Sequence, residues 1–417
     1  MYLLPLLLVV AATLGLGLWQ LRRRSLHRWL GTYLRQSPRR WASHGQHPIH
    51  LLLCIADHYE PDNGGASPEA AQARVDCWIR DYPRLFAQFR DSDGRPPRHT
   101  FFYPIETYNA DHLDALASLC RQGFGEIEIH LHHDADTPQS LQYRLETAVR
   151  LLAHRHGMLA RHRQTGSLAY AFVHGNWALA NSRPDGRWCG VDNELEILRQ
   201  TGCYADFTFP SAPDCTQLRK INSIYYAPTT GRCAHESGDD VGQVLQPPNS
   251  LLLIQGPLLL DWQHRKRGFI PHIENACIQG NQPPTDHRID LWLKARIQVP
   301  TRPDWFFVKL HTHGAPERNQ CVLLGPPMVE FHNALARRAQ QDANFHFHYV
   351  TAREMYNLVR AAESHWTGSV AAARDFELLW NAASADVPHA SPAANPKDTQ
   401  GTCPLSSLPP SGAPSVS

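Results

Sequence analysis

The sequence has no excess of charge of either sign, no closely spaced cysteine pair and no internal repeat. Its 417 residues include 40 Lys and Arg against 39 Asp and Glu, a formal net charge of +1. Nothing in this balance indicates a protein that binds nucleic acid through its phosphates, and we expect no nucleic-acid partner. None of the ten cysteines belongs to a Cys-x-x-Cys pair, which argues against a zinc ribbon.

Histidine, in contrast, is abundant, with 25 residues. Many lie in short clusters: His130/His132/His133, His154/His156, His311/His313 and His346/His348. Histidine is the commonest metal ligand and the usual acid–base side chain near neutral pH. The clusters therefore indicate metal-dependent or acid–base chemistry, although many histidines simply lie on protein surfaces.

The first residues predict a location in a membrane. Residues 2–19 are apolar and uncharged, and they are long enough to span a bilayer. A basic segment, 20–47, follows and reads as a juxtamembrane linker. Because positive charge stays on the cytoplasmic side, we expect a single-pass protein of the cell inner membrane with a cytoplasmic catalytic domain. A signal peptide is the alternative. Cysteines in apolar surroundings, such as Cys54, agree with a reducing compartment.

Residues 48–365 alternate between short apolar runs and helical stretches. The predicted strands are Ile49–Ala56, Thr100–Tyr103, Glu126–Leu131, Leu168–His174, Ser223–Ala227, Leu251–Gln255, Trp305–Leu310 and Phe345–Val350. The predicted helices are those after Ser67-Pro68, Gln139–Arg163 after Thr137-Pro138, Asp192–Gln200, Asp286–Gln298 and one after the capping box at Thr351. This alternation predicts an α/β fold, a distorted (β/α) barrel of seven or eight mostly parallel strands. Residues 381–417, rich in Pro, Ser and Ala, predict a disordered tail.

Polar side chains follow several of these strands, where the working residues of a β/α barrel gather. Asp57 and His58 follow the first strand, and His174 and His311 end two others. His130 ends a further strand, and Asp134 lies four residues later, close enough to share one ion if the loop turns helically. Together these residues predict a zinc-type site with an open position for water.

The ordered set of motifs resembles the polysaccharide deacetylase superfamily, the NodB-homology domain, over roughly residues 48–360. In that family the first strand ends in two aspartates, a base and a metal ligand, and here Asp57 and His58 occupy those positions. The resemblance implies one divalent metal ion, Zn²⁺, with His58, His130 and either Asp134 or His133 as ligands.

The resemblance also implies roles for the later segments. The groove-lining segment is matched by His174, Asn176 and Trp177, without the family's Arg and Pro. Asp206 or Asp214 would tune the general acid, and that acid would be His311, in a Leu-His motif with His313 behind it. If the match holds, Asp206 keeps His311 protonated so that it can protonate the leaving group.

The implied activity is removal of an acetyl group from an N-acetylated or O-acetylated sugar during surface polysaccharide biosynthesis. The substrate would be lipid-linked or nucleotide-linked, and Trp177, Trp262, Trp292 and Trp305 are candidates for stacking on sugar rings. Two alternatives remain open at this point. One is a β/α-barrel metallophosphoesterase or glycosidase, because His-rich strand ends also suit a two-metal site. The other is an inactive glycan-binding protein of the same fold.

Overall fold

A large, mostly parallel β-sheet organises the computed structural model, which describes residues 15–17, 19–42, 48–243 and 246–380. Its strands are β1 (Ile49–His58), β2 (His99–Pro104), β3 (Gly125–Leu131), β4 (Ala160–His162), β5 (Leu168–His174), β6 (Cys203–Asp206), β7 (Ile224–Pro228), β8 (Asp239–Asp240), β9 (Ser250–Ile254), β12 (Cys277–Ile278), β13 (Trp305–Thr312), β14 (Phe345–Tyr349) and β15 (Leu378–Trp380). A separate antiparallel hairpin consists of β10 (Leu259–Lys266) and β11 (Ile270–Glu274). The predicted α/β class is confirmed.

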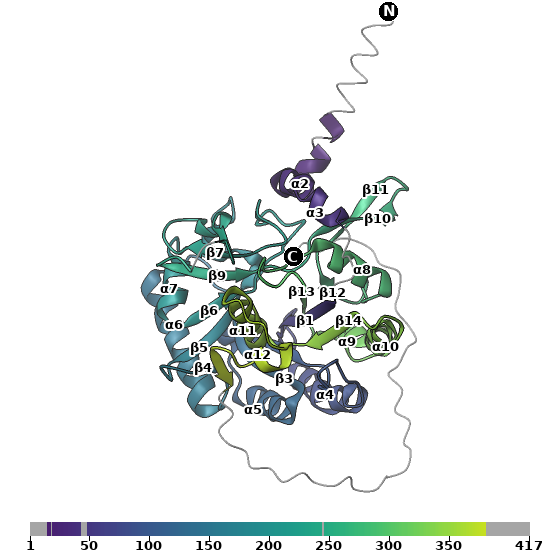
Figure 1. Cartoon of the computed structure of the whole chain (residues 1–417). Helices are drawn as coiled ribbons and strands as arrows, with labels where there is room; N and C mark the ends of the chain where they lie inside the picture. The colour runs from purple at the N-terminus through teal and green to yellow at the C-terminus, as the bar shows by residue number, and fades with distance from the viewer. Residues whose placement is uncertain (1–14, 18, 43–47, 244–245, 381–417) are drawn as a thin grey trace, which may run out of the picture. The chain divides into compact units, whose positions relative to one another are not determined.

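The main path of the sheet runs β12-β13-β1-β2-β3-β5-β6-β9-β7-β8. All pairs from β12 to β9 are parallel, and the two pairs at the far edge, β9 with β7 and β7 with β8, are antiparallel. β14 pairs with the first half of β1 and β2 with its last residues, so these two share one side of β1. Among the described strands the pairing does not close into a barrel, and what is shown is a mostly parallel sheet curving around α11 (Figure 1).

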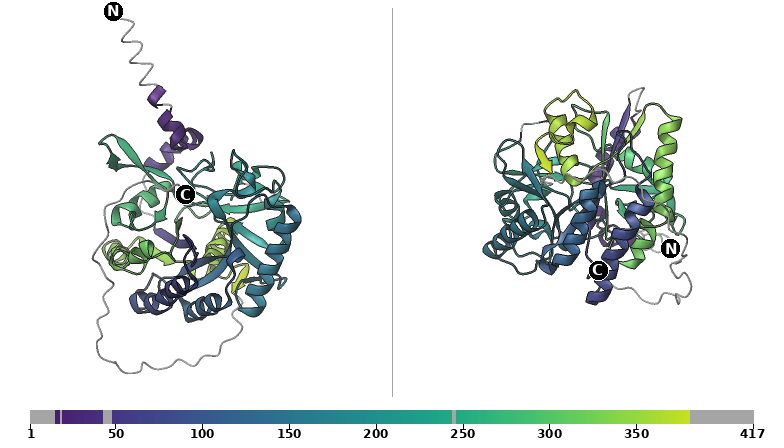
Figure 2. Two further views of the ribbon diagram at one scale, coloured as in Figure 1. Left: turned by 180° about the vertical axis from the view of Figure 1, so that it is seen from behind. Right: turned by 90° about the horizontal axis from the view of Figure 1, so that it is seen from below.

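Helices cover the outer face of this sheet (Figure 2). They are α4 (Pro68–Phe86), α5 (Ala110–Leu119), α6 (Pro138–Arg150), α7 (Glu194–Gln200), α8 (Asp286–Ala295), α9 (Glu317–Leu323) and α10 (Pro326–Gln341). The inner face packs against α11 (Ala352–Glu363). Strand side chains alternate between the faces: in β1, Leu53 and Ile55 join the outer core, whereas Leu52 and Cys54 join the inner core.

Local sequence signals fixed several helix starts. Ser67 accepts a hydrogen bond from the backbone N–H of Ala70, and Thr137 accepts one from Ser140. Thr351 and Glu354 form the predicted capping box at α11. The predicted helix over 139–163 was too long. α6 ends at Arg150 because a short turn leads to Gly157, whose φ of +67° cannot continue a helix, and β4 follows.

The basic segment over 20–47, predicted as a linker, contains α2 (Leu26–Arg35) and α3 (Ser37–Trp41). Trp29 of α2 is fully buried in the inner core. Arg28 donates a hydrogen bond to the carbonyl of Cys215 at 2.9 Å and pairs with Glu236. The described part of this segment therefore packs against the domain.

At the other end, the fold extends beyond the predicted boundary at residue 365. Residues 366–380 add α12 (Val370–Ala373) and β15, which pairs antiparallel with β4. Asn357 of α11 donates hydrogen bonds to the carbonyls of Arg374 and Leu378, which fixes this extension to the domain. The predicted disordered tail, 381–417, lies outside the described residues.

The prediction of a membrane span is corrected. In the part of the chain that the structure describes, no helix combines the length and apolarity needed to cross a bilayer. This finding contradicts the predicted single-pass location in the inner membrane with a cytoplasmic catalytic domain. Of the predicted span, residues 2–14 and 18 lie outside the described residues.

A buried histidine in the helix layer gives the fold a testable pH dependence. Burial lowers the pKa of His332, on α10, to about 3 from 6.5. Between these values the unfolded chain binds a proton that the folded chain does not, so stability falls as pH decreases below 6.5. We expect His332→Gln to reduce the slope of the free energy of unfolding against pH by about 1.4 kcal/mol per pH unit between pH 4 and 6.

Urea titrations at several pH values would measure this slope, with His154→Gln as the matched control. His154 is exposed, so the same substitution there removes one histidine without disturbing the buried core. Equal slopes for the wild type and His332→Gln would show that His332 does not titrate on unfolding.

Candidate metal centre

Five side chains converge at the carboxyl ends of β1, β3 and β13. They form the Glu60 cluster: His58, Glu60, His130, His132 and His313. Glu60 lies at the centre, with Oε1 at 3.2 Å from Nε2 of His130 and at 3.7 Å from Nε2 of both His132 and His313. Two sets of three could each hold a metal ion, His58 with Glu60 and His313, and Glu60 with His130 and His132. Several described groups can therefore hold a metal, as the sequence predicted in outline.

Strand geometry brings the first histidines together. In β1 and β3 the odd-numbered side chains, such as Ile55 and Ile129, lie in the outer core. His58 and His130 are even-numbered residues of the same strands, so both point to the inner face. Their rings lie 5.0 Å apart, and the ring of His313 lies 4.8 Å from that of His58. Nε2 of His58 is buried and has no hydrogen-bond partner among the described residues. This orphaned nitrogen is free to act as a ligand.

The ring nitrogen of His130 that faces away from Glu60 is held by a hydrogen bond, as is usual for metal-ligating histidines. Nδ1 of His130 lies 2.8 Å from the carbonyl of Val173, which can only accept, so Nδ1 carries the hydrogen. Nε2, on the other side of the ring, faces the carboxylate of Glu60 at 3.2 Å. This contact needs a positive charge, carried by a second ring hydrogen or by a bound cation in its place. Metal-ligating histidines commonly bond a carbonyl or a carboxylate in this way, and the residues present fit a metal ion.

The protonation states also suit metal binding. Burial holds the pKa of His58 well below its usual value, and the neighbouring His313 and His130 lower it further. Burial alone would raise the pKa of Glu60, but the neighbouring His130, His313 and His132 bring it below its usual value. Neutral imidazole and ionised carboxylate are the ligand forms of these groups.

Asp57, the predicted base, lies apart from this cluster. Its position in β1 turns it to the outer face, opposite His58. One carboxylate oxygen lies 2.8 Å from Nε2 of His99, and the other accepts a hydrogen bond of 2.6 Å from the backbone N–H of Gly314. The carboxylate therefore holds the Gly314 loop in place.

His311 lies on the inner face, but Asp206 does not bond it. Asp206 accepts hydrogen bonds from the backbone and hydroxyl of Thr208, and burial raises its pKa to about 7. Burial holds the pKa of His311 well below its usual value, and Lys309 lowers it further. This direction does not favour the protonated His311 that the prediction requires. The alternative, Asp214, bonds Thr216 nearby in a loop.

Of the remaining predicted ligand and groove residues, only some lie at the Glu60 cluster. Asp134 is exposed and accepts a hydrogen bond from the backbone N–H of Trp188 at 2.6 Å, so it does not join His130. Trp177 reaches the Glu60 cluster: its ring lies 6.4 Å from those of His58 and His313. Asn176 precedes it with a left-handed φ of +53°.

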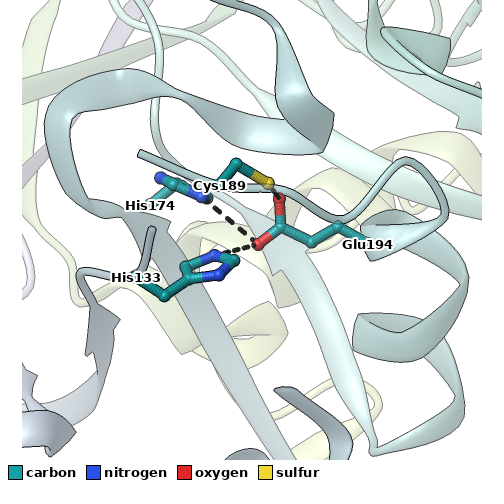
Figure 3. A group of neighbouring side chains, drawn as sticks. All are labelled: His133, His174, Cys189 and Glu194. Carbon is teal, nitrogen blue, oxygen red and sulfur yellow. Dashed lines mark hydrogen bonds and ion pairs between the residues drawn. The ribbon is translucent and has the colours of Figure 1, made fainter. Parts of the chain in front are cut away.

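His133 and His174 lie in a second group, the Glu194 cluster, with Cys189 and Glu194 (Figure 3). His174 points to the outer face of β5, since Phe172 belongs to the outer core and Val173 to the inner one. All four residues of this cluster are buried. The two clusters touch through the backbone, because a methyl group at Gly175 would lie 2.2 Å from Cδ2 of His132.

Sequence reasoning missed several of these residues. Glu60 lies two positions after His58, beyond the strand, and that short spacing was the available signal. Glu106, which bonds Nδ1 of His132 at 2.6 Å, carried no motif. Cys189 and Glu194 are 15 and 20 residues from His174, too far for a local pattern.

A cavity of about 870 Å³ lies at the opposite end of the sheet. Its lining includes Leu168, Cys203 and Ser250, which begin or adjoin the starts of β5, β6 and β9. None of the Glu60 cluster lines it. Its size does not make it the reaction site, because the metal-ligating groups gather at the carboxyl ends of the strands.

Neither the known protein families nor the curated proteins include a match to this chain. The resemblance to the polysaccharide deacetylases thus stays a prediction that rests on the motifs.

Proposed function

We propose that the protein is a metal-dependent hydrolase that removes an acetyl group from an acetylated sugar, with the Glu60 cluster as its centre. The observation that carries the proposal is the buried, unpartnered Nε2 of His58 beside the carboxylate of Glu60 and the ring of His313. Two histidines and one glutamate are a ligand set of catalytic zinc, and they leave a position open for water. The metal we propose is Zn²⁺.

When bound, such an ion would polarise the acetyl carbonyl and lower the pKa of a water molecule. His130 orients Glu60, since its ring is fixed by the carbonyl of Val173. His132 is the candidate proton donor: burial opposes its charge, but Glu106 and Glu60 raise its pKa above the usual value. Its half-exposed ring can deliver a proton to the leaving amine or hydroxyl.

The sugar ring is proposed to pack on Trp177. This indole is half-buried beside the cluster, and aromatic faces suit the apolar faces of sugars. Trp292 and Trp305 are buried in the core and are removed from the candidates, whereas Trp262 is exposed on the β10–β11 hairpin. We propose a surface polysaccharide or its lipid-linked or nucleotide-linked precursor as the source of the sugar.

The test is acetate release from a panel of N-acetylated and O-acetylated sugars, including lipid-linked and nucleotide-linked forms. The protein would be assayed as purified, after chelation, and after addition of Zn²⁺. Acetate release that disappears on chelation and returns with Zn²⁺ supports the proposal. Full activity after complete removal of metal would contradict it.

One observation favours a second candidate, a two-metal phosphoesterase. Glu60 belongs to both sets of three ligands, and a shared carboxylate is suited to bridging two ions. Two ions lost together in Glu60→Gln, with phosphate rather than acetate released from matched substrates, would favour this reading.

Removing the Trp177 indole should weaken sugar binding without emptying the metal centre. We expect Trp177→Ala to raise KM about tenfold with unchanged metal content, because a stacking contact is worth about 1–2 kcal/mol. The control is Trp41→Ala, which removes an exposed indole at the end of α3 and should leave KM unchanged. A normal KM in Trp177→Ala would place the sugar elsewhere.

A further inference from the structure

The Glu194 cluster is assembled from four separate points of the chain. His133 follows β3, His174 ends β5, Cys189 lies in the loop after it, and Glu194 begins α7. Oε1 of Glu194 lies 3.1 Å from Nε2 of His133 and 3.4 Å from Nε2 of His174. Sγ of Cys189 lies 3.5 Å from Oε2 of Glu194. The four ligand atoms all lie within 4.8 Å of one another. Figure 3 shows the side chains of His133, His174 and Cys189 gathered around the carboxylate of Glu194.

The hydrogen bonds of His174 fix which of its nitrogens faces the cluster. Nδ1 lies 2.5 Å from the carbonyl of Gly175, which can only accept, so Nδ1 carries the hydrogen. The neutral ring then directs the lone pair of Nε2 at the carboxylate of Glu194. Nε2 is buried and has no hydrogen bond of normal geometry among the described residues. A lone pair and a carboxylate oxygen facing each other in a buried site require a positive charge nearby. A proton shared by Nε2 of His133 with the same oxygen, at 3.1 Å, can supply it, and so can a bound cation in its place.

The surroundings have the arrangement that holds metal ligands in place. Nδ1 of His174 is held by the carbonyl of Gly175, whereas Nδ1 of His133 lies 3.3 Å from Oδ2 of Asp136 without the geometry of a hydrogen bond. Oε2 of Glu194 is held by the backbone N–H of Ala180 at 2.6 Å. The carboxylate is thus oriented, and Oε1 faces both rings.

We propose that His133, His174, Cys189 and Glu194 bind a second divalent metal ion in a closed, structural site of zinc type. Thiolate, imidazole and carboxylate are all zinc ligands, and four protein ligands complete a tetrahedral shell without an open position for water. The complete burial of the four side chains agrees with a structural role and separates this site from the half-open Glu60 cluster.

The site ties down a segment with little regular structure. Residues 175–193 hold two short 3₁₀ turns, at Gly175–Trp177 and Leu179–Asn181, and left-handed residues including Trp188. His174 precedes this segment, and Cys189 and Glu194 close it. The ion would cross-link the two ends of the loop that carries Trp177 and would stabilise the folded state by its binding free energy.

Cobalt substitution tests the proposal, because the Glu60 cluster contains no cysteine. The full-length protein would be stripped with a chelator and loaded with Co²⁺. We expect a thiolate-to-cobalt charge-transfer band in the near ultraviolet and about one more ion per chain than the Glu60 cluster binds. The band should vanish in Cys189→Ala and persist in Cys120→Ala, a matched truncation of a buried cysteine outside the cluster.

No band in the loaded wild type, or a band that survives in Cys189→Ala, would overturn the proposal. Glu194→Gln guards against misfolding, because it keeps the side-chain shape and the hydrogen bond from Ala180. We expect this variant to keep a folded circular dichroism spectrum and to lose at least tenfold in cobalt affinity at the thiolate site. The cobalt band also distinguishes the two proposals. A protein that shows the band but releases no acetate would contradict the hydrolase proposal and leave the structural metal site supported.

Discussion

Replacing Glu60 with glutamine should lower kcat/KM about a thousandfold or more and release the metal from the Glu60 cluster. The substitution keeps the size of the side chain but removes the negative charge that faces His130, His132 and His313. Three powers of ten correspond to about 4 kcal/mol, the scale expected when a buried charge that organises several partners is lost. Steady-state kinetics and metal analysis of the same preparation would measure both effects.

The matched control is Glu330→Gln. The side chain of Glu330 is 64 % exposed and forms its surface ion pair with Arg337, so kcat/KM and metal content should stay at the wild-type values. An active Glu60→Gln enzyme with its metal in place would remove Glu60 from the centre and with it the proposed ligand set.

A methyl group at Gly314 should destabilise the protein by about 3 kcal/mol or more. An added Cβ would lie 2.1 Å from Oδ2 of Asp57 and 2.8 Å from Cζ2 of Trp78. The carboxylate cannot swing away without breaking its bonds to His99 and to the Gly314 N–H, and Trp78 is fully buried. The free-energy costs of overpacking and of a broken buried hydrogen bond then add.

Urea denaturation of Gly314→Ala in the presence of a chelator would measure the loss without a contribution from metal binding. Gly31→Ala is the control. Gly31 is an exposed residue of α2 with nothing within 4 Å of an added Cβ, so alanine should be neutral or stabilise by up to about 1 kcal/mol. Equal stability of Gly314→Ala and wild type would show that the loop shifts freely and that Asp57 does not fix it.

The strands of the sheet could be predicted because buried parallel strands are short apolar runs, and β1, β3, β5 and β13 were found within a few residues of their bounds. β6 was missed as a strand because it has four residues, one of them Asp206. The pairing order, and thus the failure of the described strands to close a barrel, depends on contacts between distant segments that periodicity does not encode.

The candidate site was predictable in its location and less so in its membership. His58 and His130 were expected to meet, and they do, because both end parallel strands on the same face. Asp57 was expected beside His58, but adjacent residues of one strand point to opposite faces. His132 and His133 follow the end of β3, where alternation stops, so their directions depend on the loop. Glu194 comes from a helix that only the folded chain brings near His174.

The adjacency of His132 and His133 couples the two clusters. One residue faces Glu60 and the next faces Glu194, and one peptide unit joins them. Whatever immobilises the backbone at one of these positions lowers the entropy still to be lost at the other. If both centres bind metal as proposed, their occupancy would be linked reciprocally: each bound ion would raise the affinity for the other by the same factor, and a chelator would strip them cooperatively rather than one by one.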